Sequence, residues 1–270
     1  MTAQGTLTPP NSIQTLGGFR VTLNGTPVQR WRAGRARQLF QLLLAHHGRP
    51  IPKADLISAV WGDSPARSPE VSLKVAVCIL RGIIAETGTP NGDGGGIRIV
   101  SHPASYSLEA DSTFIDVEEF ESLVAQATAL DALGRRAEAA DHYRRAVHLY
   151  TGPYLPEGRE SWAMIRRERL QDALLHALGW LADDAELRGD QLAVHDLHQR
   201  ILEVDPCREE SYRALMRYHA RARQPSRVQR WYIACATQLS DRLGLEPDRQ
   251  TRSLFYKAMS GNPEPLHRVH

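Results

Sequence analysis

Residues 69–86, PEVSLKVAVCILRGIIAE, carry two cations on one side of a segment whose apolar residues recur at helical spacing. The apolar set consists of Leu73, Val77, Leu80 and Ile84, and this spacing predicts one buried helix face. Lys74 and Arg81 fall on the opposite side, together with Cys78 and Gly82. Ammonium and guanidinium groups on an exposed helix bind phosphate oxygens and guanine edges. The segment is therefore a candidate reader of nucleic acid, although many amphipathic helices only cover a core.

Other cations lie where a DNA duplex could meet the same domain. Arg35 and Arg37 begin a predicted helix, whose first amides help to bind a phosphate. Arg98 and His102 belong to a predicted hairpin, and a hairpin cation suits a narrow minor groove. The alternative for each residue is a solvated surface charge, while Trp61 and Tyr106 are assigned to the core. The predicted DNA-contacting residues are Arg35, Arg37, Ser72, Lys74, Val75, Cys78, Arg81, Arg98 and His102.

The strands and helices expected to position these residues can be predicted in their order along the chain. Strands are predicted within residues 13–31 around the hairpin turn Asn24-Gly25, helices at 35–46, 53–61 and 69–86, and two strands within 97–108. Loops are expected at residues 63–68 and at the TPNGDGGG turn, residues 89–96. Strands followed by three helices and a hairpin are the topology of a winged helix, whose third helix enters the major groove. We therefore predict a disordered leader at residues 1–12 and a winged-helix DNA-binding domain at residues 13–110.

The net charge of +2 is unevenly distributed along the 270 residues. Residues 11–110 contain 11 basic and 6 acidic residues, which gives +5. Residues 111–262 contain 21 basic and 24 acidic residues, which gives −3. A basic first part beside a mildly acidic second part fits two domains with different partners. A charge imbalance without any partner is the alternative.

The second part has helical periodicity throughout. Seven helices are predicted, at residues 116–133, 137–150, 161–188, 191–204, 209–222, 226–243 and 248–259, with Gly, Asp and Pro at the breaks. The unit LRGDQLAVHDLHQRILEVDP resembles a tetratricopeptide (TPR) helix pair, and stacked pairs present a concave surface to a protein or peptide. Arg230, Trp231 and Tyr232 form either an interface or, as we favour, part of the packing between the last helices. We predict an all-α, TPR-like domain at residues 111–260 and a tail at 261–270, in a chain that is mainly α.

Both parts together resemble the SARP family, the Streptomyces antibiotic regulatory proteins. The resemblance rests on LGGFRVTLNGTPV, GRPIPKADLISAVWGD, SLKVAVCILRGII and IRIVSHPASYSL in the first part, and on FIDVEEFESLVAQA, YLPEG, SWAMIRRERLQDAL and QLSDRLGLEPDRQTRSLFYKAM in the second. It implies a winged helix of the response-regulator (OmpR) type followed by a bacterial transcriptional activation domain. It also implies an activator that binds direct repeats at promoters of antibiotic biosynthetic genes, commonly as a dimer, and recruits RNA polymerase holoenzyme.

The third helix departs from the family pattern. Family members carry several basic residues where this chain has Cys78, Ile79 and Gly82. A good bidentate base contact contributes roughly 1–3 kcal/mol of discrimination. Fewer such contacts imply lower intrinsic specificity or greater dependence on the wing.

Other classes of protein are disfavoured by composition and motifs. With 42% hydrophobic and 24% charged residues, no long apolar run and no signal peptide, the sequence predicts a cytoplasmic, nucleoid-associated protein without membrane contact. The three scattered cysteines predict reduced thiols rather than disulfides or zinc. No phosphate loop or hydrolase motif occurs, so no enzyme, cofactor or metal is expected. His195 and His198, and the pair His46-His47, favour surface roles over metal binding.

Two hypotheses of function are compatible with these features of the sequence. The favoured one is a sequence-specific transcriptional activator that uses the winged helix. The alternative is a regulatory adaptor that binds a protein through the helical domain and whose DNA-binding domain has weakened. The activator predicts DNA affinity that falls steeply with salt. The adaptor predicts retained partner binding with little specific DNA binding.

Overall fold

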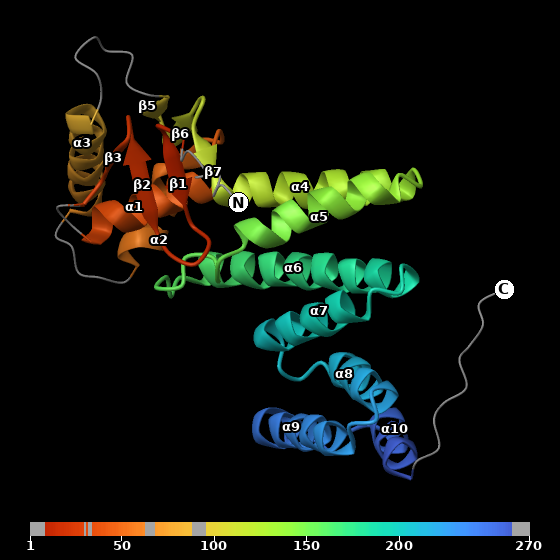
Figure 1. Cartoon of the computed structure of the whole chain (residues 1–270). Helices are drawn as coiled ribbons and strands as arrows, with labels where there is room; N and C mark the ends of the chain where they lie inside the picture. Colours follow the sequence, from red (N-terminus) through yellow and green to blue (C-terminus); the bar gives the residue numbers. More distant parts are fainter. Residues whose placement is uncertain (1–8, 30, 32–33, 63–67, 88–95, 261–270) are drawn as a thin grey trace. The chain divides into compact units, whose positions relative to one another are not determined.

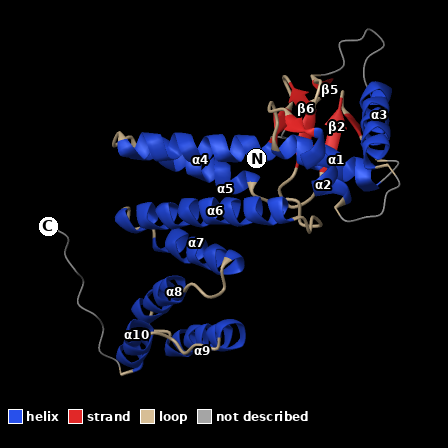
Figure 2. Ribbon diagram, turned by 180° about the vertical axis from the view of Figure 1, so that it is seen from behind, coloured by secondary structure: helices blue, strands red, loops and turns tan. Residues whose placement is uncertain are grey.

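The computed structural model describes residues 9–29, 31, 34–62, 68–87 and 96–260. Its contacts divide the chain into two compact units. The first unit holds the chain up to Glu119 together with Thr151–Arg167, and the second holds Phe120–Tyr150 and the chain from Glu168 onward. All the strands among the described residues belong to the first unit, and the described part of the second is helical (Figures 1 and 2). The predicted fold class, mainly α with a winged helix before a helical domain, is confirmed.

The described residues of the first unit form two small sheets and three complete helices, together with the first turns of two further helices. Its elements are β1 (Ser12–Gln14), β2 (Arg20–Leu23), β3 (Thr26–Pro27), α1 (Gly34–Ala45), β4 (Ile51–Pro52), α2 (Lys53–Trp61), α3 (Pro69–Thr87), β5 (Ile97–Ser101), β6 (Ser105–Ala110) and β7 (Phe114–Ile115). One sheet has the order β3-β2-β1-β7, with β1 and β7 parallel, and the other has the order β4-β6-β5. The order of strands, three helices and a terminal hairpin is that of a winged helix.

The turn between β2 and β3 forms as the sequence predicts. Asn24 and Gly25 both adopt positive φ angles, 49° and 77°, which is the backbone that a two-residue hairpin of matching twist requires. Strand β1 already begins at Ser12, inside the predicted leader. The predicted loop at 63–68 and the 89–96 turn lie almost wholly outside the described residues, as do most of the leader and the tail at 261–270.

The three helices of the first unit surround one apolar core. Each helix contributes side chains that are at most 2% exposed, among them Leu39, Leu43, Leu56, Leu73 and Leu80. Strand β6 adds Leu108, which is fully buried. Helix α3 contacts α1, α2 and strand β5. This packing fixes which face of α3 is left for solvent.

A buried carboxylate joins the start of the next helix, α4 (Asp116–Ala132), to the end of β1. Asp116 is 5% exposed and accepts hydrogen bonds from the amides of Thr15 and Leu16, at 2.8–2.9 Å, and from the Thr15 hydroxyl at 2.7 Å. The segment at 151–160, before the helix that begins at Ser161, also contacts this region, since the Leu155 amide donates to the Thr15 carbonyl and the Gly17 amide to the Pro153 carbonyl. These long-range bonds connect residues that are 100 or more positions apart in the sequence.

The described part of the second unit is helical. Its elements are most of α4, α5 (Arg136–Leu149), most of α6 (Ser161–Leu187), α7 (Gln191–Val204), α8 (Glu209–Arg221), α9 (Pro225–Leu243) and α10 (Arg249–Met259). These bounds agree with the predicted helices to within one residue. Tyr143 on α5 and Leu174 and Leu178 on α6 are buried, and the centre of the Tyr143 ring lies 4.9 Å from that of Trp180 on α6.

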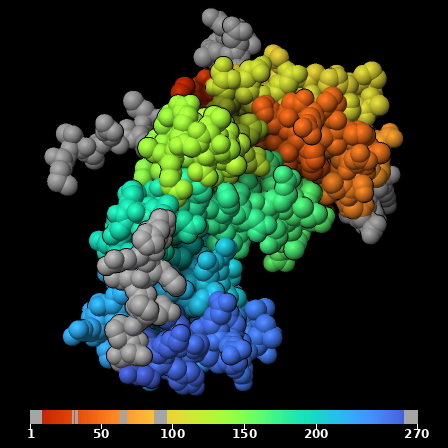
Figure 3. Space-filling model, turned by 90° about the vertical axis from the view of Figure 1, so that its right-hand side faces the viewer, coloured from red at the N-terminus to blue at the C-terminus, as the bar shows by residue number. Residues whose placement is uncertain are grey.

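The last three helices pack against one another. The side chains of α8, α9 and α10, in shades of blue, lie together in Figure 3. Tyr212, Cys235 and Leu239 form a buried cluster that Trp231 flanks. Tyr232 stacks on Phe255 with ring centroids 4.1 Å apart. Trp231 and Tyr232 therefore pack between helices, as favoured from the sequence, while Arg230 is exposed.

Candidate nucleic-acid interface

Helix α3 presents one apolar face to the core, as its sequence predicts. Leu73, Val77 and Leu80 are at most 2% exposed, while Ile84 is half-buried. Pro69 is tolerated at the first helical position because that amide has no partner inside the helix. The helix can thus be held rigidly while its other side meets a ligand.

The outer face of α3 is an exposed stripe, which we call the α3 stripe and define as Val71, Lys74, Val75, Cys78 and Arg81. At 100° per residue these positions fall within one side of the helix. Val71 and Val75, one turn apart, are 56% and 52% exposed. Neither the Lys74 side chain nor the Cys78 side chain forms a hydrogen bond or ion pair with any described residue. The stripe offers a cation and small apolar groups together.

Ser72 lies away from the α3 stripe. It is half-buried, and its hydroxyl donates to the Ser68 carbonyl at 3.2 Å, in the turn where α3 begins. A hydroxyl bonded to the carbonyl four residues earlier is satisfied within its own helix. The structure therefore does not bring Ser72 together with Lys74, Val75 and Cys78.

Arg81 connects α3 to the hairpin formed by β5 and β6. Its Nη2 donates to the Ile99 carbonyl at 2.7 Å and to the Ser101 hydroxyl at 2.8 Å, and its Nε lies 3.3 Å from the same carbonyl. Hydrogen bonds from a charged donor are stronger than neutral ones. Arg81 therefore fixes the hairpin against α3, besides being an exposed member of the α3 stripe.

The turn of this hairpin is attached to the start of α2. The Lys53 amide donates to the Ala104 carbonyl at 2.9 Å, and its Nζ donates to the Pro103 carbonyl at 2.7 Å. His102 lies at the same turn, with Nε2 3.1 Å from the Ser107 hydroxyl. Lys53 was not among the predicted contacts. The only feature of the sequence that could have indicated Lys53 as a contact was its position directly after Pro52, at the start of a helix.

Arg98 lies at the other end of the hairpin from His102. Its Nε donates to Glu109 at 2.5 Å, and Nη2 is 3.6 Å from Asp111. The hydrogen bond and charge of Glu109 raise the pKa of Arg98. Two carboxylates thus offset this cation, and the structure separates it from the turn.

Arg35 and Arg37, at the start of α1, have partners inside the first unit. Arg35 donates to the Val60 carbonyl at the end of α2. Arg37 pairs with Glu157 at 2.9 Å, and its guanidinium lies 5.2 Å from the Phe19 ring centre. These contacts bridge elements of the fold, so neither guanidinium is wholly available to a phosphate.

The histidines considered as metal ligands have other neighbours. His46 lies 3.1 Å from the Leu42 carbonyl, and His47 lies between Glu118 and the Ala110 amide. His195 contacts Asp196 at 3.1 Å, and His198 contacts the Ser211 hydroxyl at 3.1 Å. Within the described ranges, no group of three potential metal-binding side chains occurs. No described helix is long and apolar enough to span a membrane.

Residues 115–257 match the family model described as the bacterial transcriptional activator domain. This chain belongs to that family. The bacterial transcriptional activator domain begins in β7 and extends into α10. Its family consists of transcriptional regulators, not enzymes, and the resemblance to SARP proteins is confirmed.

Two relatives and one solved structure extend the match over the winged helix. The transcriptional regulator RedD of Streptomyces coelicolor is 28% identical over 237 residues, which cover 86% of this chain and 66% of RedD. The regulatory protein AfsR of Streptomyces griseus is 24% identical over 264 residues, covering 94% of this chain and 26% of AfsR. Mycobacterium tuberculosis EmbR, solved in complex with a low affinity phosphopeptide, has a TM-score of 0.72 at 22% identity and covers 95% of this chain and 66% of that one. The EmbR likeness supports the two-part fold.

Proposed function

We propose that this chain is a sequence-specific, DNA-binding transcriptional activator that acts on promoters of a secondary-metabolite gene cluster. It binds direct repeats through the winged helix and recruits RNA polymerase through the helical domain. The α3 stripe is the observation that carries the proposal, because a cation and small apolar side chains stand exposed on a helix whose back is buried. The +5 charge of residues 11–110 favours a polyanion as the ligand of this domain.

The residues of the interface have different roles in this proposal. Lys74 binds a phosphate or a guanine edge, while Val75 and Cys78 contact base edges in the major groove. Arg81 positions the hairpin through Ile99 and Ser101. The hairpin turn, with His102 and Lys53, approaches the DNA backbone.

The remaining predicted contacts are auxiliary. Arg35 and Arg37 bind phosphate with the donors that Val60 and Glu157 leave free, and Arg98 adds long-range attraction that its two carboxylates reduce. Ser72 stabilises the first turn of α3. Two copies bind one pair of repeats, and the protein acts in the cytoplasm at the nucleoid.

Recovery of genomic fragments by the purified protein tests the proposal. Sheared DNA from the host bacterium is incubated with the wild-type chain, with Lys74→Ala and with Arg144→Ala, which removes an exposed cation of α5. We expect wild type and Arg144→Ala to enrich the same few promoters bearing a direct repeat, and Lys74→Ala to lose them. On a recovered fragment, Lys74→Ala should also reduce the salt slope of binding by about 0.9 if it removes one phosphate contact.

The same recovery experiment can also contradict the proposal. Enrichment no greater than for a protein-free control at moderate salt would exclude sequence-specific binding. The function would then lie in the helical domain, which binds a protein partner in the adaptor hypothesis. Retained capture of such a partner by the Lys74→Ala variant would support that function.

A further inference from the structure

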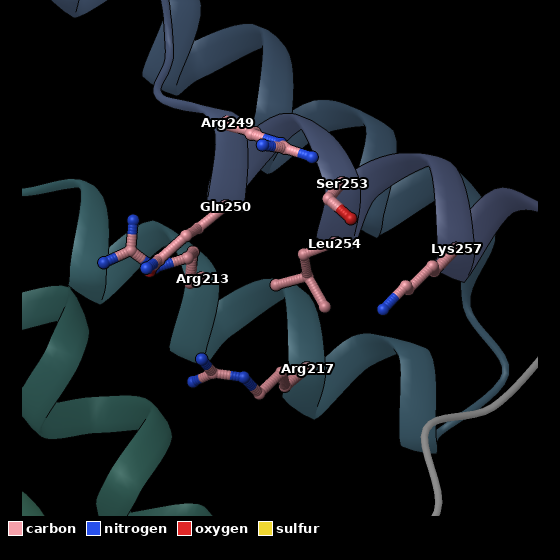
Figure 4. Close-up of a pocket in the computed structure, with 7 residues that line it drawn as sticks. All are labelled: Arg213, Arg217, Arg249, Gln250, Ser253, Leu254 and Lys257. Carbon is pink, nitrogen blue, oxygen red and sulfur yellow. The ribbon is translucent and has the colours of Figure 1, made fainter.

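A basic pocket of about 350 Å³ lies between α8 and α10, entirely inside the second unit. Its lining consists of Arg213, Arg217, Arg249, Gln250, Ser253, Leu254 and Lys257. Figure 4 shows Leu254 and Lys257 extending from α10 toward α8, where Arg213 and Arg217 lie one turn apart. Four of the seven lining side chains are cations, and none is acidic.

The pocket has a fixed wall at the start of α10. Asp248 caps this helix by accepting from the Thr251 amide at 2.6 Å. Arg213 donates to both residues, to Asp248 at 2.9 Å and to the Thr251 hydroxyl at 3.0 Å. The Glu209 carboxylate accepts from the Asp248 amide at 2.9 Å. These bonds join α8 to the first turn of α10 and hold Arg213 in place.

The remaining cations of the pocket are not neutralised in the same way. Arg213 has a carboxylate partner in Asp248, whereas Arg217, Arg249 and Lys257 form no ion pair with any side chain in the described part of the chain. Three like charges around one cavity repel each other. A bound polyanion would remove this repulsion.

The chemistry of the lining favours phosphate groups. Planar guanidinium groups bind phosphate oxygens in a bidentate manner, and an ammonium adds a point charge. Gln250 and Ser253 supply neutral donors. The volume falls within the range of small-molecule sites. Leu254 is the one aliphatic side chain of the lining, whereas a docked peptide helix depends on several apolar anchors.

We propose that this pocket binds a phosphorylated small molecule that carries at least two negative charges. The ligand is recognised through its phosphate oxygens by Arg217, Arg249 and Lys257, with Arg213 held at the edge by Asp248. The site is separate from the α3 stripe and does not depend on DNA binding.

Calorimetric titration of the full chain with inorganic pyrophosphate tests this site. We expect one molecule to bind per chain. The double variant Arg217→Gln/Lys257→Gln should raise the dissociation constant by about a hundredfold, since each of the two lost charged hydrogen bonds weakens binding by about tenfold. The matched control is Arg144→Gln/Arg230→Gln, which removes two exposed cations of α5 and α9. This control should bind as the wild type does.

Circular dichroism verifies that the variants fold, and Arg249→Gln alone serves as a milder pocket variant if the double variant unfolds. Absence of binding up to about 5 mM pyrophosphate, a range that includes very weak sites, would overturn the proposal. Equal loss in the pocket and control variants would also overturn it, because it would indicate attraction by net charge. Binding of poly-glutamate without pyrophosphate would assign the pocket to an acidic protein segment instead.

Discussion

At the scale of residues, Val71 and Val75 are the least expected feature of the α3 stripe. Both are more than half exposed, although valine is commonly buried. In a major groove, a small apolar side chain packs against the C5-methyl group of thymine. The stripe can thus recognise thymine through apolar contacts. Such contacts do not require the basic residues that family members carry at the positions of Cys78 and Gly82.

Removal of thymine methyl groups tests this reading. Replacing thymine by deoxyuracil within a bound repeat deletes only the methyl, and we expect the affinity to fall about fourfold per contacted base, the equivalent of about 0.8 kcal/mol per buried methyl. In Val75→Ala the same DNA change should have little effect. Fluorescence anisotropy measures both, with Leu133→Ala, an exposed residue of the second unit, as the control protein. An equal deoxyuracil effect in Val75→Ala and wild type would exclude this contact.

His198 should make the free energy of unfolding of the helical domain depend on pH. Burial lowers its pKa below the ordinary value of 6.5, against the opposing effect of Glu210 and Glu186. Below pH about 6.5 the unfolded chain therefore binds a proton that the folded chain resists, so the free energy of unfolding falls as the pH decreases. His198→Gln should flatten this dependence in denaturant titrations between pH 7.5 and about 5. It should flatten it only in part, because burial also lowers the pKa of His219. An unchanged slope in the variant would contradict this assignment.

At the scale of elements, Asp116 connects β1 to the start of α4. Its carboxylate accepts from Thr15, Leu16 and Val117 in a buried site. Burial raises its pKa while these donors oppose the shift. An amide in the same place would direct its NH₂ group at backbone donors, leaving buried groups unpaired.

Asp116→Asn should therefore reduce the free energy of unfolding by roughly 1–3 kcal/mol. Hydrogen exchange of β1 and β2 should accelerate in the same variant. The control is Asp111→Asn, an exposed carboxylate, for which a change within about 0.5 kcal/mol is expected. Equal stability of wild type and Asp116→Asn in urea would show that the buried bonds do not hold β1.

The helices were predictable from the sequence because their signal is local. The spacing of Leu73, Val77 and Leu80 gives the buried face of α3 directly, and Asn24-Gly25 gives a hairpin. The two-residue strands β4 and β7 were not predicted, since their partners β6 and β1 lie far away in sequence. The attachment of residues 151–167 to the first unit was not predicted for the same reason.

The candidate site was predictable only in part. Exposure of Lys74 and Cys78 followed from the helical period. The partners of Arg37 and Arg98 did not, because Glu157 is 120 residues from Arg37 and Glu109 lies on the opposing strand. A sequence identifies a cation readily, but not the acid or carbonyl that folding places beside it.

At the scale of the whole molecule, a direct repeat predicts how many copies bind. Two copies should occupy a two-repeat fragment and one copy a fragment in which the second repeat is scrambled, since each winged helix reads one repeat. Analytical ultracentrifugation of the complexes measures this stoichiometry. Two copies on the single-repeat fragment would indicate a preformed dimer, and one copy on the two-repeat fragment would contradict the proposed arrangement.

Transcription in vitro tests activation most directly. The purified chain is added to host RNA polymerase holoenzyme on a template carrying a recovered promoter, in parallel with Lys74→Ala and Arg144→Ala. An activator predicts several-fold more transcript with wild type and Arg144→Ala, and none of this increase with Lys74→Ala or with a scrambled repeat. Unchanged or reduced transcript from a promoter that the wild-type chain demonstrably occupies would contradict the assignment of this protein as an activator.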